Sequence, residues 1–152
     1  METPVSCNFG CIPLVGEPFR HRIRVRFNEC DGQGVVFYAN YLVYFDIAIT
    51  ELLREAVGDG YSGLIGSGTD MMVAEATIRY RAPARFDDEL DLVVSLTRIG
   101  TTSTVTHMEA VRVADETVLA EGELRHVYID LGTLEKTEIP DEVRAGMGKF
   151  SE

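Results

Sequence analysis

The chain of 152 residues is expected to fold as one α+β domain, with an antiparallel five-stranded sheet wrapped around one long central helix. Two patterns predict this class. Segment 41–56 carries apolar residues at helical spacing over more than one face, which is typical of a helix enclosed on most sides. Five other segments alternate apolar and polar residues as strands do, one before the helix and four after it. The turns between the last four are short, so these strands are expected to be antiparallel neighbours.

A polar loop joins the first predicted strand to the helix. Segment 22–27 alternates three arginines with three apolar residues, which predicts a half-buried strand. Residues 28–34 then form a loop in which Gly32 and Gly34 allow a sharp turn. The loop leads to the start of the helix, where the first backbone N–H groups lack internal partners and carry partial positive charge. An acidic loop at this place is well suited to chemistry.

The elements after the helix are bounded by turn residues. Segment 58–69 contains five glycines and is predicted to be a flexible crossing loop. The predicted strands that follow it are 73–81, 90–96, 104–113 and 118–129. Turns are expected at Asp87–Asp88, at a tight hairpin around Gly100, and at 114–116. Segment 139–144 is predicted to be a short surface helix or coil.

The first 18 residues are expected to form an irregular N-terminal arm, and residues 19–152 the folded domain. Segment 1–18 contains three prolines and two glycines and has no sustained apolar period. Cys7 and Cys11 lie four apart in this arm. Because no second cysteine or histidine pair has ligand spacing, the sequence predicts no metal site.

Composition excludes several classes of partner. The formal net charge of -11 argues against nucleic acid or an anionic membrane surface as the main partner. No apolar run approaches the roughly 20 residues of a membrane helix, and no basic region followed by an apolar stretch marks a secretory signal. Three cysteines are an odd, sparse set that suits a reducing compartment. The expected location is therefore the cytoplasm.

The loop and the start of the helix carry a motif that resembles a known enzyme family. The motif reads Asp31-Gly32-Gln33-Gly34-Val35-Val36-Phe37-Tyr38-Ala39-Asn40-Tyr41. It resembles the signature of the hotdog-fold acyl-CoA thioesterases, in the branch of 4-hydroxybenzoyl-CoA thioesterase and YbgC-like proteins. Segment 80–90, the hairpin at 100–103 and the strand segment 120–122 agree with the family in the same order. The resemblance covers about residues 20–140.

The resemblance implies a fold, an activity and an assembly. It implies the hotdog fold, hydrolysis of acyl-CoA thioesters, and a homodimer joined at the sheet edges that often pairs into a tetramer, with active sites at the dimer interface. It assigns the catalytic carboxylate to Asp31 and the backbone N–H that polarises the thioester carbonyl to Tyr38. The substrate contacts expected from it are Gly34, Val35, Phe37, Asn40, Thr102 and Ser103.

The chemistry of thioester hydrolysis agrees with these residues. Negative charge develops on the carbonyl oxygen, and an unpaired N–H at a helix start stabilises it. A carboxylate can attack the carbonyl to form an anhydride or can activate water as a general base, so both roles of Asp31 stay open. The sequence has no zinc-ligand set, no Gly-x-Ser-x-Gly elbow and no phosphate-binding glycine loop. The expected reaction needs no cofactor.

Structural alternatives stand beside each of these assignments. Aspartate before glycine is a common turn residue, so Asp31 has a conformational explanation too. Glu29 is the rival carboxylate, although a residue beside a strand end is more often solvated or ion-paired. Asn40 is equally well a helix cap, and Asp46 a pairing residue. Cys30 has no neighbour in the sequence that would activate a thiol.

Two other functions remain open from the sequence. One is hydrolysis of acyl-acyl carrier protein, for which an acidic surface is a poor match to an acidic carrier. The other is a non-catalytic acyl-CoA-binding hotdog module. Tyr38 stands where YbgC-like relatives carry His, and the Gly100 hairpin offers Arg98 but no run of basic residues for the CoA phosphates. The nucleotide contacts and the acyl group are therefore not assigned.

Overall fold

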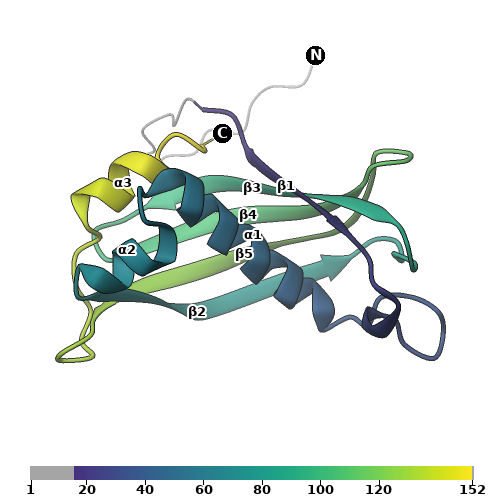
Figure 1. Cartoon of the computed structure of the whole chain (residues 1–152), viewed down its shortest axis with the longest axis horizontal. Helices are drawn as coiled ribbons and strands as arrows, with labels where there is room; N and C mark the ends of the chain where they lie inside the picture. The colour runs from purple at the N-terminus through teal and green to yellow at the C-terminus, as the bar shows by residue number, and fades with distance from the viewer. Residues whose placement is uncertain (1–15, 152) are drawn as a thin grey trace, which may run out of the picture.

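The 17-residue helix α1 (Asn40–Ala56) lies across one face of a five-stranded antiparallel sheet (Figure 1). The computed structural model of the chain describes residues 16–151. The sheet has the strand order β1-β3-β4-β5-β2, in which the strands are β1 (Phe19–Arg24), β2 (Thr69–Tyr80), β3 (Glu89–Ile99), β4 (Ser103–Arg112) and β5 (Thr117–Asp130). Two short helices, α2 (Gly60–Gly66) and α3 (Asp141–Met147), lie near the C-terminal end of α1. The predicted α+β class, the strand count and the central helix are confirmed.

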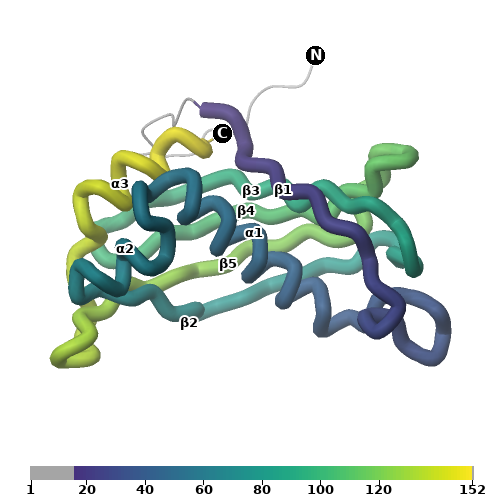
Figure 2. Tube along the Cα trace, viewed as in Figure 1, coloured from purple at the N-terminus to yellow at the C-terminus, as the bar shows by residue number. Residues whose placement is uncertain are grey.

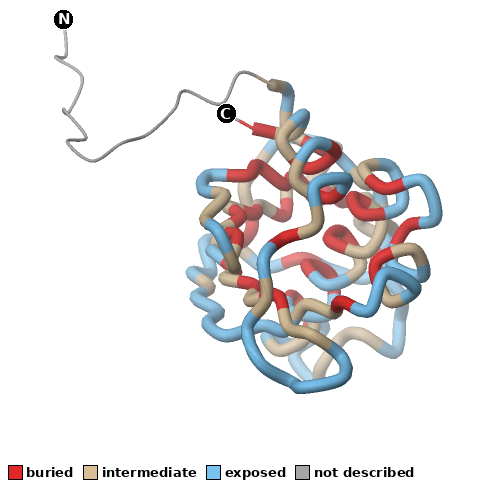
Figure 3. The backbone as a smooth tube through the Cα atoms, turned by 90° about the vertical axis from the view of Figure 1, so that its left-hand side faces the viewer, coloured by how far each residue is buried: buried red, intermediate tan, exposed pale blue. Residues whose placement is uncertain are grey.

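The core lies between α1 and the inner face of the sheet. The helix residues that are buried there are Tyr41, Tyr44, Phe45, Ala48, Ile49, Leu52 and Leu53. Alternate residues of β3, from Leu90 to Leu96, are fully buried beneath them, and Figure 3 shows the buried segments gathered inside the domain. One flank of the helix stays open, since Leu42 is 44% and Val43 54% exposed. Within one chain the helix is therefore less enclosed than its composition predicts.

The two edges of the sheet differ. Strands β4 and β5 are interior strands, so neither offers a free edge. Strand β1 is a short edge strand (Figure 2). On the same edge of β3, Leu96 forms an isolated parallel bridge with Ser151. Strand β2 is the long edge, and most of its residues are exposed. A long edge strand without proline is a template for pairing with another strand.

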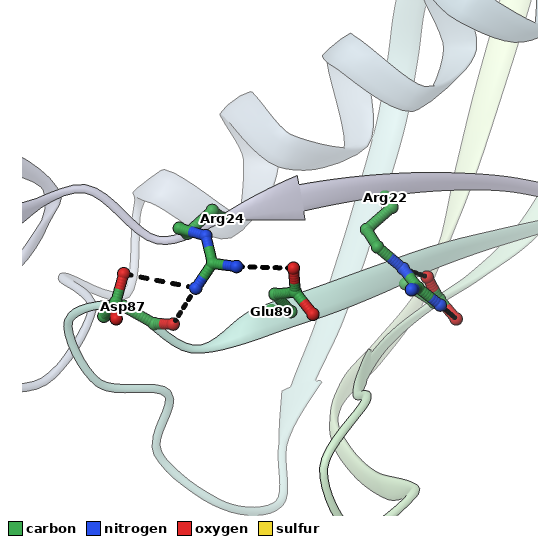
Figure 4. Close-up of polar contacts among 5 residues, drawn as sticks. Arg22, Arg24, Asp87 and Glu89 are labelled. Atoms are coloured by element: carbon green, nitrogen blue, oxygen red, sulfur yellow. Dashed lines mark hydrogen bonds and ion pairs between the residues drawn. The ribbon is translucent and has the colours of Figure 1, made fainter.

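Two arginines of β1, Arg22 and Arg24, are paired with acidic residues in β3 or just before it. Arg22 Nε lies 2.8 Å from Asp91 Oδ1, and Arg24 pairs with both Asp87 and Glu89 (Figure 4). Arg22 and Arg24 therefore do not form a free basic surface. Exposed ion pairs of this kind contribute little stability. The strand predicted over 22–27 begins and ends three residues earlier than expected, because residues 27–29 form a short 3₁₀ turn, η1 (Phe27–Glu29).

Segment 58–69 is not the flexible loop that its glycines predict. It contains helix α2, whose Leu64 is only 1% exposed. Burial of this side chain overrides the low helix propensity of glycine. The predicted tail helix extends further than expected, to Met147, and buries Val143 and Met147 against the core.

Most of the predicted N-terminal arm, including Cys7 and Cys11, lies outside the described residues. Residues 16–18 precede β1 without regular structure, and Gly16 packs closely on the backbone carbonyl of Lys149. In the described part of the chain, no helix is long and apolar enough to cross a membrane.

Candidate active site

The acidic loop is closed by the backbone and side chain of Asp31. The Asp31 N–H donates to Val35 O at 2.8 Å, and the Gly34 N–H donates to Asp31 O at 3.0 Å. Gly34 has a φ of +74°, which side-chain-bearing residues rarely adopt. Asp31 Oδ1 accepts the Gln33 N–H at 2.8 Å. Within residues 16–151 its Oδ2 has no hydrogen-bond partner, so one carboxylate oxygen stays free for chemistry.

The loop is braced from outside by the segment that precedes β3. Val35 and Arg85 form an isolated antiparallel bridge, and the Val36 N–H donates to Ala84 O at 2.9 Å. Of the predicted substrate contacts, Gly34 is exposed and Phe37 is 42% exposed. Both therefore lie on the surface of the loop that carries Asp31.

Tyr38 lies two residues before the start of α1. The Asn40 N–H donates to Phe37 O and the Tyr41 N–H to Tyr38 O, but the Tyr38 N–H has no acceptor among the described residues. Its backbone carbonyl accepts the Tyr80 hydroxyl at 3.0 Å. A positioned N–H of this kind, at the positive end of a helix, can bind a developing oxyanion.

Tyr80, at the end of β2, is a site residue that sequence reasoning missed. Its ring packs edge-on against Tyr38, with centroids 6.4 Å apart, and against Tyr41 at 5.5 Å. Burial raises the pKa of Tyr80, and the neighbouring Tyr38 adds to the shift, so the hydroxyl remains a donor at neutral pH. An aromatic residue three positions before Pro83, where the strand must end, was the only available signal.

Glu29, the rival carboxylate, is engaged in structural bonds. Its Oε2 accepts the Tyr44 hydroxyl at 2.8 Å and the Arg26 N–H at 2.7 Å. Burial raises the pKa of Tyr44, and the hydrogen bond to Glu29 raises it further. Asn40 is not the helix cap that was considered, because its Nδ2 donates instead to Glu29 O at 2.8 Å. Glu29 and Asn40 thus tie the loop to the helix.

Thr102 and Ser103 lie at the other end of the molecule. The Tyr128 N–H donates to Thr102 O, and Arg144 of α3 donates to Gly100 O. Helix α3 packs on the C-terminal end of α1, because Gly146 touches the carbonyl of Ala56. The 17 residues of α1 span about 25 Å at 1.5 Å per residue. A single chain therefore does not bring this hairpin to Asp31.

The outer face of the sheet, opposite α1, carries a second group of polar residues. A hollow of about 260 Å³ lies there, beside Thr77, His107 and Glu121. In the described residues, one set could ligate a divalent cation, namely His107, Glu109 and Glu121, whose ligand atoms lie within 4.8 Å of one another. Arg81 already bonds the Glu121 carboxylate. This face is separate from the loop of Asp31.

Comparisons with known proteins identify the family to which this fold belongs. The model of the thioesterase-like superfamily matches residues 25–147. The acyl-CoA thioester hydrolase YbgC of Escherichia coli O6:H1 is 32% identical over 127 residues, which cover 84% of this chain and 93% of YbgC. A 1,4-dihydroxy-2-naphthoyl-CoA hydrolase of Nostoc punctiforme is 30% identical, with 82% and 83% covered. The structure of gentisyl-coenzyme A thioesterase BH1999 superposes with a TM-score of 0.75 and 28% identity, covering 83% of this chain and 99% of that one.

The five-stranded antiparallel sheet curled around α1 is that of a hotdog-fold thioesterase. The chain belongs to the thioesterase-like superfamily, and the resemblance carried by its loop motif is confirmed.

Proposed function

We propose that this thioesterase hydrolyses small or medium acyl-CoA thioesters, with Asp31 as the catalytic carboxylate and the Tyr38 backbone N–H as the oxyanion donor. The observation that carries the proposal is that, among residues 16–151, the Tyr38 N–H has no acceptor and the Asp31 Oδ2 of the adjoining loop has no hydrogen-bond partner. The relatives support the CoA ester as substrate class, since YbgC is named as an acyl-CoA thioester hydrolase.

The reaction follows from these two groups. The thioester carbonyl oxygen accepts the Tyr38 N–H, which stabilises the negative charge of the tetrahedral intermediate. The Asp31 carboxylate then either attacks the carbonyl carbon or takes a proton from an attacking water. In both routes the C–S bond breaks and the thiolate of CoA leaves. Water supplies the hydroxyl of the acid product, directly or by hydrolysing the anhydride.

We infer that the site is completed by a second copy of the chain. Strand β2 begins near α2 and ends at Tyr80, beside Tyr38. When two β2 edges pair antiparallel, the N-terminal end of β2 in one copy lies beside the C-terminal end of β2 in the other. The hairpin with Thr102 and Ser103 of a second copy then approaches the Asp31 loop, which one chain cannot achieve. A homodimer, or a tetramer built from two such dimers, accounts for all predicted contacts.

The test measures thiol release from a panel of acyl-CoA esters of increasing length, with the wild-type protein and with Asp31→Asn. Asparagine keeps the shape and the bond from Gln33 but is neither a nucleophilic carboxylate nor an effective base. We expect turnover to fall by about 10²–10⁴ while binding of a non-hydrolysable analogue is retained. Asp141→Asn, an exposed aspartate at the start of α3, is the matched control and should behave like wild type.

The outcomes separate the alternatives. Binding of acyl-CoA without thiol release by the wild type would favour a non-catalytic module. Faster hydrolysis of acyl-acyl carrier protein than of acyl-CoA would favour the carrier-protein enzyme. Near wild-type turnover in Asp31→Asn would show that another group is the catalytic carboxylate.

A further inference from the structure

His126 of β5 is a buried polar side chain to which the proposed reaction gives no role. It is 4% exposed, lies on the inner face of the sheet, and makes no hydrogen bond among the described residues. Thr104 is its cross-strand partner on β4 and is 1% exposed. Within residues 16–151 its Oγ1 has no partner of good hydrogen-bond geometry, although it lies near enough to Tyr128 to oppose the rise that burial causes in the pKa of that tyrosine. Buried polar groups are nearly always hydrogen-bonded, so the unsatisfied Thr104 hydroxyl beside the His126 imidazole indicates a place where a polar ligand group binds.

The exposed stripe of α1 leads from the reacting centre toward His126. Tyr38, Leu42 and Asp46 are spaced four residues apart, so they follow one face of the helix. Leu42 is 44% exposed, and Asp46 is exposed as well. At 1.5 Å per residue, Asp46 lies about 12 Å along the helix from Tyr38.

Asp46 is the charged group that acts on His126 from the helix. Burial lowers the pKa of His126, and the negative charge of Asp46 opposes this effect. The imidazole is therefore neutral at neutral pH, with one nitrogen that donates and one that accepts. Tyr61 is also close to Asp46, but its hydroxyl is occupied by a bond of 2.7 Å to Asp70.

The inner surface of β2 lies opposite the exposed stripe of α1, and the two border one strip of surface. Tyr80 marks its end beside Tyr38 and is 50% exposed. Val73, the cross-strand partner of His126 on β2, is 53% exposed. The strip between α1 and β2 is therefore apolar along its length and polar at the end that is remote from Tyr38.

We propose that this strip binds the acyl group of the substrate and that His126, with Asp46, recognises a hydroxyl group at the end remote from the thioester. The inference rests on the proposed thioesterase function. The carbonyl oxygen sits at the Tyr38 N–H, the apolar part lies along Leu42 and Val73, and the terminal hydroxyl bonds the imidazole and the carboxylate. A methyl group in its place leaves both polar groups unpaired, which is a strong basis for discrimination.

The test compares pairs of CoA esters that differ only in a terminal hydroxyl or methyl group, in aromatic and aliphatic series of rising length. We expect kcat/KM for the hydroxyl member to exceed that of the methyl member at least tenfold at the matching length. His126→Leu should bring this ratio close to one, whereas His126→Gln, which keeps a donor and an acceptor, should retain part of it. His107→Gln, on the outer face, should leave the ratio unchanged.

Other results would overturn the inference while leaving hydrolysis intact. These are a wild-type ratio below threefold at every length, or an equal ratio in wild type and His126→Leu. If His126→Leu does not fold, the ratio is measured in Asp46→Asn, which changes an exposed position. A ratio equal to that of wild type would then overturn the inference. If the protein hydrolyses none of the esters, the proposed function fails. In that case the dissociation constants of the paired esters test recognition of the hydroxyl: tighter binding of the hydroxyl member in wild type but not in His126→Leu supports it, and equal binding contradicts it.

Discussion

Glu29 and Asp31 are two carboxylates only two residues apart, and the fold places them in different surroundings. The Glu29 carboxylate accepts bonds from Tyr44 and Arg26 and holds the loop to α1. The Asp31 carboxylate uses one oxygen for the turn and leaves the other free. The difference arises because the 3₁₀ turn directs the first side chain inward, under the helix. The second then lies on the loop surface.

This contrast predicts the effect of Glu29→Gln. The glutamine side-chain oxygen can still accept the Tyr44 hydroxyl, so the loop should keep its shape. We expect thiol release to fall by less than tenfold, with a modest decrease in thermal stability, whereas Asp31→Asn loses about 10²–10⁴ in rate. Steady-state kinetics and thermal unfolding of the two variants check this. An inactive Glu29→Gln beside an active Asp31→Asn would reverse the assignment.

His126 also makes a prediction about pH. Its pKa is lowered by burial in the folded protein, whereas in the unfolded chain it is about 6.5. The unfolded state then binds more protons than the folded state. The contribution of His126 to the free energy of unfolding is therefore fully present above about pH 6.5 and is lost as pH falls through the lower folded pKa.

Urea unfolding between pH 7 and pH 5 measures this dependence. The free energy of unfolding of His126→Gln should change less with pH than that of wild type. For His107→Gln it should change with pH as in wild type, even if its absolute value differs. The Arg22 hydrogen bond lowers the pKa of Asp91, so loss of that contribution belongs below about pH 4, outside this range. Equal slopes in wild type and His126→Gln would contradict the prediction.

At the scale of elements, the close contact between α3 and α1 limits side-chain size. A Cβ on Gly146 would lie 1.9 Å from the carbonyl oxygen of Ala56. The obstructing atom is backbone, so the helices must separate to admit a methyl group. This contact holds the C-terminal part of α1 beside the Gly100 hairpin.

Gly146→Ala should therefore lower the free energy of unfolding by about 1–3 kcal/mol, although alanine favours helices. Gly66→Ala, at the end of α2, is the control, because nothing lies within 4 Å of the added Cβ. That change should be neutral or stabilise by about 0.4–1 kcal/mol. Urea denaturation measures both. A Gly146→Ala protein as stable as wild type would show that the helices are not tightly apposed.

At the scale of the whole molecule, β2 exposes an unpaired edge and apolar side chains. Val73 is 53% exposed on the inner face of β2, and Leu42 and Val43 of α1 are exposed on the adjoining flank. Contiguous exposed apolar surface of this kind marks an interaction site. Pairing of two β2 edges would enclose this surface, together with the strip between α1 and β2 proposed for the acyl group, and would bring the distant hairpin to the Asp31 loop.

We therefore expect the protein to sediment as a dimer or a tetramer of its 16.9 kDa chain. Val73→Lys introduces charge at an exposed position of β2, so the chain should fold but dissociate. Sedimentation measures this effect, because Val73 also borders the strip proposed for the acyl group and its change lowers thiol release directly as well. Thr97→Lys, at an exposed position of the interior strand β3, should change neither assembly nor activity. A wild-type monomer at micromolar concentration, or an active Val73→Lys monomer, would contradict this prediction.

The local patterns of the sequence determined the elements and the chemistry of the loop. The apolar period of 41–56 predicts α1 to within one residue at its start, and short turns predict the antiparallel order of β3, β4 and β5. These features depend on neighbours in the sequence, as do the bend at Gly34 and the carboxylate of Asp31. The motif that resembles the thioesterases lies in one continuous segment, so it was visible without the fold.

Contacts between distant segments were decided only by the tertiary structure. Local propensity does not reveal that Leu64 is buried and stabilises α2 within a glycine-rich segment. It also does not reveal that Tyr80 holds Tyr38, or that the 100–103 hairpin lies at the opposite end of α1. The burial of His126 beside Thr104 arises from the register of β4 and β5, which no local pattern specifies. Burial and pairing depend on how strands far apart in the chain are brought together, so these properties belong to the folded molecule.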